Sequence, residues 1–254
     1  MTHRILILGG TGEARQLAGR LAGHADLAVS LSLAGRTAAP LAQPVPTRIG
    51  GFGGVAGLAE HLRRDAVDLL VDATHPHAAR ISANALTAAE LTGVPLIRLR
   101  RAAWQPGDGD RWTVVRNVEQ ARSALGAAPR RVFLTLGRNE VAVFAAAPQH
   151  SYLVRSVDPI EPPLAVPDAS YLLARGPFEM EAERDLLRAH GIEAIVAKNS
   201  GGEATYAKIA AARALGIEVV LIEAPSEPTP AVATVEAAVE AIGHQLASLT
   251  ARGA

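Results

Sequence analysis

Short apolar runs alternate with stretches of helix length along the chain, and this alternation limits the possible folds more than any other feature. An apolar run of this length that carries no polar alternation is typical of a strand buried on both faces. In the first part of the chain the predicted strands are Arg4–Leu8, Ala28–Leu33, Thr47–Ile49, Leu69–Asp72 and Leu96–Leu99, and the predicted helices are Glu13–Gly23, Val55–Arg64 and Ala78–Thr92. Strands separated by helices in this way predict a parallel sheet covered on both faces.

The same alternation begins again after a turn-rich segment, residues 104–111, which reads as a linker. The later predicted strands are Val132–Leu136, Tyr152–Val157, Leu172–Ala174, Ala194–Ala197 and Val219–Ile222, and the later predicted helices are Asn139–Ala146, Glu179–His190, Thr205–Leu215 and Val235–Leu249. We therefore expect an α/β protein of two units, residues 1–105 and 106–254, each with a parallel sheet of about five strands flanked by helices. A chain of 254 residues is long enough for two such cores.

Composition excludes several classes of function. The chain has no cysteine, which excludes a disulfide framework, a thiolate zinc site, an iron–sulfur cluster and a cysteine nucleophile. Its 25 basic and 25 acidic side chains leave no general field for nucleic acid. We find no apolar stretch near the roughly 20 residues of a membrane span and no signal-peptide core at the start, so we expect a cytoplasmic protein without membrane contact.

The first predicted strand runs into a glycine turn and then a helix, an arrangement that can bind a phosphate. Glycines allow the backbone to approach the phosphate, and the helix N-terminus offers unpaired N–H groups and the positive end of a dipole. The candidate cofactor residues here are Gly9, Gly10, Thr11, Gly12, Glu13 and Ala14. Arg15 stands where the dinucleotide motif has its third glycine, so a simple turn with positive φ is the alternative.

Two further loops of the first unit point to a nucleotide. The second strand is followed by Arg36 and Thr37 rather than by the acid that binds the ribose of NAD, and a guanidinium suits the 2′-phosphate of NADP. The alternative for Arg36 is an ordinary surface arginine. The third strand ends in a loop that contains Gly51 and Gly53, which allow the backbone to run close to a cofactor or form a flexible surface loop.

The fourth predicted strand ends at the edge of the sheet where parallel α/β proteins bind ligands. Asp72, Ala73 and Thr74 at this edge are further candidate cofactor residues, and His75 and His77 follow them, with Arg80 one turn beyond. Two histidines two positions apart do not face one direction along a helix, and no third ligand is evident. We therefore expect hydrogen bonding or packing from these histidines rather than a metal site.

Basic and small polar residues follow the predicted strands of the second unit. The candidates are Arg138, Arg155, Arg175, Lys198, Asn199, Ser200, Gly201, Gly202 and Thr205. Both lysines of the chain, Lys198 and Lys208, fall in one strand–loop–helix segment, although chance is an alternative for so small a number. If these loops meet at one edge, they form a basic pocket within a half whose net charge is −4 (14 basic and 18 acidic residues), which predicts a carboxylate-rich substrate.

Seven motifs in this order together resemble the precorrin-6A reductase family of cobalamin biosynthesis. They are Leu8-Gly9-Gly10-Thr11-Gly12-Glu13-Ala14, Ser32-Leu33-Ala34-Gly35-Arg36, Gly50-Gly51-Phe52-Gly53-Gly54, Asp72-Ala73-Thr74-His75-Pro76, Leu134-Thr135-Leu136-Gly137, Gly176-Pro177-Phe178 and Lys198-Asn199-Ser200-Gly201-Gly202. The first motif alone is not specific, but the ordered set extends over nearly the whole chain, from about residue 4 to 224.

The resemblance implies two Rossmann-like lobes with the active site in the cleft between them. It implies NADPH-dependent reduction of one double bond of a ring-contracted macrocycle, from precorrin-6A to precorrin-6B. The acetate and propionate arms of that tetrapyrrole account for the basic loops. His75, His77 and Lys198 are the candidate proton donors or electrostatic stabilisers, and Asp72 is more suited to fixing its loop.

Three alternatives remain at this point. The first is NADH-dependent reduction of the cobalt-containing substrate of the anaerobic pathway, which Arg36 disfavours. The second is a Rossmann-like protein that senses NADP without catalysis, and the third is a nucleotide-sugar transferase. A monomer and a small homo-oligomer are both compatible with the sequence.

Overall fold

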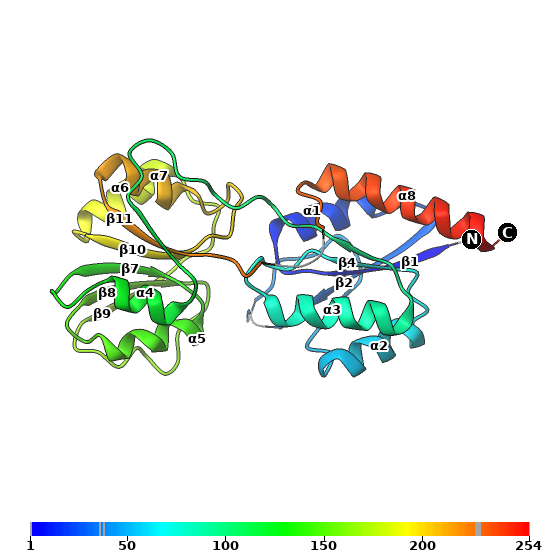
Figure 1. Ribbon diagram of the computed structural model, residues 1–254, viewed down its shortest axis with the longest axis horizontal. Coiled ribbons are helices and arrows are strands. Elements are labelled where there is room, and N and C mark those ends of the chain that lie inside the picture. Colours follow the sequence, from blue (N-terminus) through cyan, green and yellow to red (C-terminus); the bar gives the residue numbers. More distant parts are fainter. Residues whose placement is uncertain (1, 36, 38, 227–229, 254) are drawn as a thin grey trace. The chain divides into compact units, whose positions relative to one another are not determined.

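The computed structural model describes residues 2–35, 37, 39–226 and 230–253, so the predicted cofactor residue Arg36 lies outside the described residues (Figure 1). The chain divides into two compact units, the first formed by Met1–Arg101 with Ser226–Ala254 and the second by Ala102–Pro225. Each unit is a parallel sheet flanked by helices, which confirms the predicted α/β fold with two Rossmann-like lobes.

In its described residues the first unit contains a five-stranded parallel sheet of order β3-β2-β1-β4-β5. Its strands are β1 (His3–Leu8), β2 (Leu27–Leu33), β3 (Thr47–Ile49), β4 (Leu69–Asp72) and β5 (Leu96–Arg98), and its helices are α1 (Gly12–Leu21), α2 (Gly54–Arg64), α3 (Ala79–Thr92) and α8 (Val235–Gly253). The strand order reverses between β1 and β4. In open α/β sheets, the ligand site lies at the carboxyl ends of the strands beside this reversal.

Strand β1 shows how the first unit is held together. Successive side chains of a strand point to opposite faces. Ile5 and Ile7 pack against α1 and α8 on one face, whereas Leu6 and Leu8 pack against α2 and α3 on the other. All four are almost fully buried. A sheet covered on both faces explains why the strand lacks the polar alternation of a half-exposed strand.

The second unit repeats this strand order. In its described residues it has a six-stranded parallel sheet of order β6-β11-β10-β7-β8-β9. Its strands are β6 (Trp112–Val115), β7 (Arg131–Thr135), β8 (Ser151–Ser156), β9 (Ala169–Leu173), β10 (Ala194–Lys198) and β11 (Glu218–Ile222), and its helices are α4 (Val118–Ala124), α5 (Arg138–Val141), the 3₁₀ helix η1 (Ala142–Ala146), α6 (Met180–Ala189) and α7 (Ala207–Leu215). Strands β7 to β11 correspond in order to β1 to β5, and β6 is added beside β11.

The chain crosses from one unit to the other twice, once after β5 and once after β11. After β5 the chain enters the second unit and forms β6 beside β11. After β11 it returns to the first unit, where Val232 forms a parallel bridge to Leu99, and continues into α8. Figure 1 shows α8 beside α1. The structure thus differs from the division at residue 105, which placed 226–254 in the second unit, because Val235, Ala238 and Ile242 complete the first core.

Local details differ from the sequence-based prediction where the signal is short. Strand β6 and helix α4 occupy a region for which the sequence pattern predicts neither a strand nor a helix. The helix expected at Asn139–Ala146 is a four-residue α5 followed by η1. None of the helices in the described ranges has the length and apolar character needed to cross a membrane.

Candidate active site

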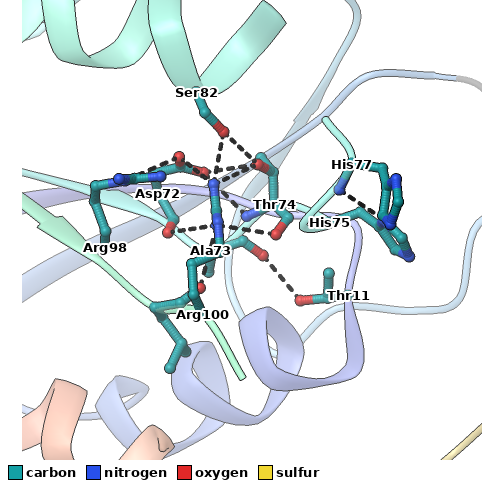
Figure 2. A network of polar contacts seen from close by, with 10 residues as sticks. Thr11, Asp72, Ala73, Thr74, His75, His77, Ser82, Arg98 and Arg100 are labelled. Carbon is teal, nitrogen blue, oxygen red and sulfur yellow. Dashed lines mark hydrogen bonds and ion pairs between the residues drawn. The ribbon is translucent and has the colours of Figure 1, made fainter. Parts of the chain in front are cut away.

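The glycine turn after β1 is held in place by one threonine. Thr11 is the N-cap of α1, and its Oγ1 accepts a hydrogen bond from the N–H of Ala14 at 3.1 Å. The same hydroxyl donates to the carbonyl oxygen of Ala73 at 2.9 Å (Figure 2). Gly10 has a φ of +117°, which L side chains rarely adopt. The turn therefore joins the start of α1 to the loop after β4.

Open space lies next to the glycines at this edge. A Cβ built on Gly10, Gly12, Gly51 or Gly53 meets no heavy atom of the described structure within 4 Å. Together with the N–H groups at the start of α1, this arrangement fits the diphosphate of a dinucleotide, which needs backbone without side chains next to it. Glu13, in the first turn of α1, is held at 2.7 Å from Arg101; burial opposes its charged form, but this bond keeps the pKa of Glu13 below its usual range.

Asp72, the last residue of β4, is the centre of a buried polar network (Figure 2). Its side chain is completely buried. Arg100 Nη2 lies 2.6 Å from Asp72 Oδ2, and Thr74 donates to Oδ1 through its N–H at 3.1 Å and its hydroxyl at 2.7 Å. Arg98 Nε lies 3.9 Å from the same carboxylate, and Arg100 also donates to Ser82 Oγ at 2.6 Å.

The charges of this network identify Asp72 as a structural anion. Burial alone would raise the pKa of Asp72, but Arg100 and the hydrogen bonds from Thr74 hold that pKa below its usual range. The carboxylate therefore stays ionised near neutral pH and is unsuited to donating a proton. It holds the loop that follows through Thr74, with two arginines as its partners.

His75 and His77 lie at the end of this loop, before α3. Both are half-buried, and their ring centroids are 5.6 Å apart. The N–H of His77 donates to Nδ1 of His75 at 3.2 Å, so the proton of a neutral His75 sits on Nε2. In Figure 2 the two rings lie together, away from the Asp72 network. Arg80 is exposed in the first turn of α3.

Arg48 organises the glycine loop after β3. Its guanidinium donates to the carbonyl oxygens of Gly50 at 2.7 Å and Gly51 at 3.1 Å, and to Ser32 Oγ at 3.1 Å. It also lies 4.0 Å from the ring centroid of Phe52. The loop that contains Gly51 and Gly53 is thus tied to the end of β2. Thr37, predicted to contact the cofactor, is half-buried after that strand.

At the carboxyl edge of the second unit, Lys198 occupies the place that Asp72 has in the first. It ends β10 and pairs with Glu140 of α5 at 2.5 Å. The other carboxylate oxygen of Glu140 accepts from the N–H of Gly137, which caps α5. Lys198 is half-buried, and the first residue of α5, Arg138, is exposed.

Arg155 has a partner that the sequence did not indicate. This buried residue of β8 makes a bidentate pair with Glu183 of α6, at 2.5 and 2.9 Å. Its guanidinium lies 3.8 Å from the ring centroid of Phe178 and 4.8 Å from that of Phe133. Arg155 is therefore enclosed by protein groups, unlike the exposed Arg175.

The loop from Asn199 to Thr205 is bonded to Trp104. The side chain of Asn199 accepts from the N–H of Trp104 at 2.8 Å and donates to its carbonyl oxygen at 3.0 Å. The indole Nε1 of Trp104 donates to the carbonyl oxygen of Gly202 at 2.8 Å. Ser200 Oγ lies 3.5 Å from Thr205 Oγ1, while Gly201 and Gly202 both have positive φ. This network gives the loop one defined shape.

The structure brings the predicted residues together in two groups. Thr11, Ala73 and the Asp72 loop meet in the first unit, and Lys198 with the following loop forms the second group. Sequence reasoning singled out Lys208 without giving it a role, and it missed the other partners of both groups, which are Arg98, Arg100, Ser82, Trp104 and Glu183. The available sequence signal for Arg98 and Arg100 was the run of arginines at the end of β5, because a charged residue at the end of a strand can reach the ligand edge.

Comparison with known proteins agrees with this geometry. Residues 4–243 match the protein family described as "Precorrin-6x reductase CbiJ/CobK". The chain belongs to that family. It is 58% identical to the precorrin-6A reductase of a Sinorhizobium species, covering 96% of this chain and 94% of that protein. It is 53% identical to the precorrin-6A reductase of Rhodobacter capsulatus, covering 89% of each.

A solved structure described as "CobK precorrin-6A reductase" matches with a TM-score of 0.90 and 50% identity, covering 96% of this chain and 97% of that one. Membership of this reductase family agrees with the resemblance noted in the sequence.

Proposed function

We propose that this protein reduces precorrin-6A to precorrin-6B with NADPH, as a step of cobalamin biosynthesis. The observation that carries the proposal is the high identity, over nearly the full chain, to proteins that are themselves named precorrin-6A reductases. The ordered glycine turns of the first unit and the basic loops of the second support it from the structure.

The first unit is the cofactor unit in this proposal. The backbone around Gly10, Gly12 and Gly51 would hold the diphosphate and ribose, Thr11 and Asp72 would keep the two loops in place, and Arg36 would select the 2′-phosphate. When bound, NADPH supplies the hydride that adds to one double bond of the macrocycle.

The second unit is the substrate unit in this proposal. Arg138, Arg175 and the loop from Asn199 to Thr205 would bind the carboxylates of the tetrapyrrole, with Arg80 of the first unit as a further cation. Arg155 would contribute through its buried pair with Glu183 rather than by direct contact. His75, His77 and Lys198 are the candidates to donate the proton that balances the added hydride, and positioning of the substrate supplies the rest of the catalysis.

The first experiment is oxidation of NADPH by the purified protein with precorrin-6A, run in parallel with NADH. We expect loss of NADPH absorbance and a product heavier by two hydrogen atoms. Equal rates with NADH would contradict the assigned role of Arg36 and favour the reaction of the cobalt-containing substrate. Folded protein that binds NADPH but oxidises none of it would favour the sensor function.

The role of Arg36 has a matched pair of variants. R36L removes the cation, and we expect it to reduce the preference for NADPH over NADH by roughly tenfold or more, since a charge-assisted pair to phosphate is lost. R36K keeps a positive charge without the planar fork and is expected to retain part of the preference. An unchanged preference in R36L would remove Arg36 from the site.

A further inference from the structure

Lys208 is a buried cation to which the mechanism above assigns no role. It lies in the first turn of α7 and is 5% exposed. Its Nζ donates to the carbonyl oxygen of Thr205 at 2.7 Å and lies 5.3 Å from the ring centroid of Trp104. A lysine is almost never so deeply buried unless it is paired or has a specific task.

The charges around Lys208 do not balance. The charged groups that act on it are Arg155 from β8 and Glu183 from α6. Both carboxylate oxygens of Glu183 are already bonded to Arg155. Protonated Lys208 therefore adds one positive charge that no carboxylate of this cluster compensates. Burial, together with the repulsion from Arg155, lowers the pKa of Lys208 to about 7.

Lys208 and Trp104 both hold the loop that we assign to the substrate. Trp104 is bonded to Asn199 and to Gly202, and Lys208 holds Thr205 at the other end. The uncompensated ammonium is thus bonded directly to this loop, through the carbonyl oxygen of Thr205, and it lies beside the indole that holds the loop at Gly202. An anion placed on this loop would supply the missing negative charge.

We propose that Lys208 is a positioning residue for the substrate. It holds the Asn199–Thr205 loop, and its positive charge attracts a carboxylate of the tetrapyrrole to this loop. This inference rests on the proposed function and deepens it. By linkage, a carboxylate on the loop binds more tightly when Lys208 is protonated, and its binding raises the affinity of Lys208 for its proton.

The test is the pH dependence of the KM for precorrin-6A at saturating NADPH, from about pH 6 to about pH 9. In the unmodified protein we expect the KM to rise with pH, by roughly tenfold for each unit by which a bound carboxylate raises the pKa of Lys208. K208M should show the high KM at every pH, with kcat within about twofold and the KM for NADPH unchanged. The carboxylates of the substrate ionise near pH 4 and do not titrate in this window.

The control is R188M, which removes an exposed cation of α6 and should follow the unmodified protein. A KM that does not change with pH in the unmodified protein, or a K208M variant that keeps the pH dependence, overturns the role of Lys208. Absence of any turnover of precorrin-6A by the unmodified protein overturns the proposed function instead.

A second readout needs neither substrate nor turnover. Trp104 and Trp112 are the two tryptophans of the chain, so W112F leaves Trp104 as the reporter. We expect its emission to change with pH as the neighbouring ammonium loses its proton, with a midpoint near 7, and K208M in the same background to remove this change. Emission that is constant with pH in W112F would contradict an exchangeable charge beside Trp104. Because W112F retains Lys208, its pH titration tests the proposal even if K208M does not fold.

Discussion

The carboxyl edges of the two sheets are built on the same strand order but present opposite groups. The strand in the fourth place ends with Asp72 in the first unit and with Lys198 in the second. The first strand is followed by a ten-residue helix capped by Thr11 in the first unit, and by the four-residue α5 capped by Gly137 in the second. In the proposed function, one topology would therefore support a diphosphate site at one edge and a site for carboxylates at the other.

A second comparison concerns the buried charges near each edge. In the first unit Asp72 lies between Arg98 and Arg100, and in the second Glu183 lies near Arg155 and Lys208. Each group combines one carboxylate with two cations, an excess of one positive charge that favours anions. Arginine keeps its proton at every pH that a protein meets, whereas a buried lysine can lose it. We therefore expect the second edge, and not the first, to respond to pH near neutrality.

The largest expected effect is that of D72N on the stability of the first unit. The substitution leaves two buried arginines without their anion, and we expect a loss of about 3–5 kcal/mol in the free energy of unfolding. Both tryptophans lie in the second unit, so circular dichroism should show the loss while the tryptophan emission transition in urea stays in place. The exposed Asp65 gives the control D65N, with a change below about 1 kcal/mol. Equal shifts of both signals would show that the two units unfold together.

The matching change in the second unit is E183Q, with a smaller expected cost of roughly 2–3 kcal/mol. Glutamine leaves Arg155 charged and buried, but Lys208 can relieve part of the repulsion by releasing its proton. The loss should appear in the tryptophan emission transition. We expect the midpoint of the Trp104 pH titration to move to lower pH in this variant, since Glu183 favours protonated Lys208. A larger loss in E183Q than in D72N would contradict the difference drawn between lysine and arginine.

Acid should destabilise the first unit through Asp72. Its folded pKa lies below the unfolded value, so its contribution to stability is fully present above the unfolded pKa and is lost as the pH falls through the folded one. Each pH unit between these two values removes about 1.4 kcal/mol. Urea unfolding followed by circular dichroism, from about pH 6 to about pH 3, should show this slope, and D72N should reduce it. An equal slope in D72N would assign the acid sensitivity to other carboxylates.

Local patterns predicted the elements that are long and buried. The bounds of β4 agree with the sequence-based range, because an apolar run between turn residues marks a buried strand. Strand β6 was missed because it is a four-residue strand with a half-exposed Val114 and pairs with β11, far away in the sequence. Residues 226–254 likewise belong to the first unit because the chain returns to it after β11, and composition does not reveal this return.

Local sequence patterns likewise predicted some residues of the candidate site and missed those that depend on long-range contacts. The glycine turns and the loop after β4 were predictable, since their chemistry is contained in a few consecutive residues. The partner of Asp72 was not, because Arg98 reaches it through the register of β4 against β5, which pairs these two residues across the sheet. Glu183 and Lys208 lie on two neighbouring helices, and only the packing of α6 on α7 brings their charges together.

The smallest expected effect separates the two tasks of Thr11. Loss of the N-cap bond in T11A should cost about 1 kcal/mol of stability, whereas glycine at an N-cap costs only a few tenths. The second unit already has glycine at this place, at Gly137. If capping is the main task, T11G should stay near the unmodified protein. If the bond from Thr11 to the carbonyl of Ala73 matters more, T11A and T11G should raise the KM for NADPH alike, by about fivefold, and T11S should restore it. We expect the second result, because that bond joins the two loops of the proposed cofactor edge. If the KM for NADPH is unchanged in both variants, capping of α1 is the only task of Thr11.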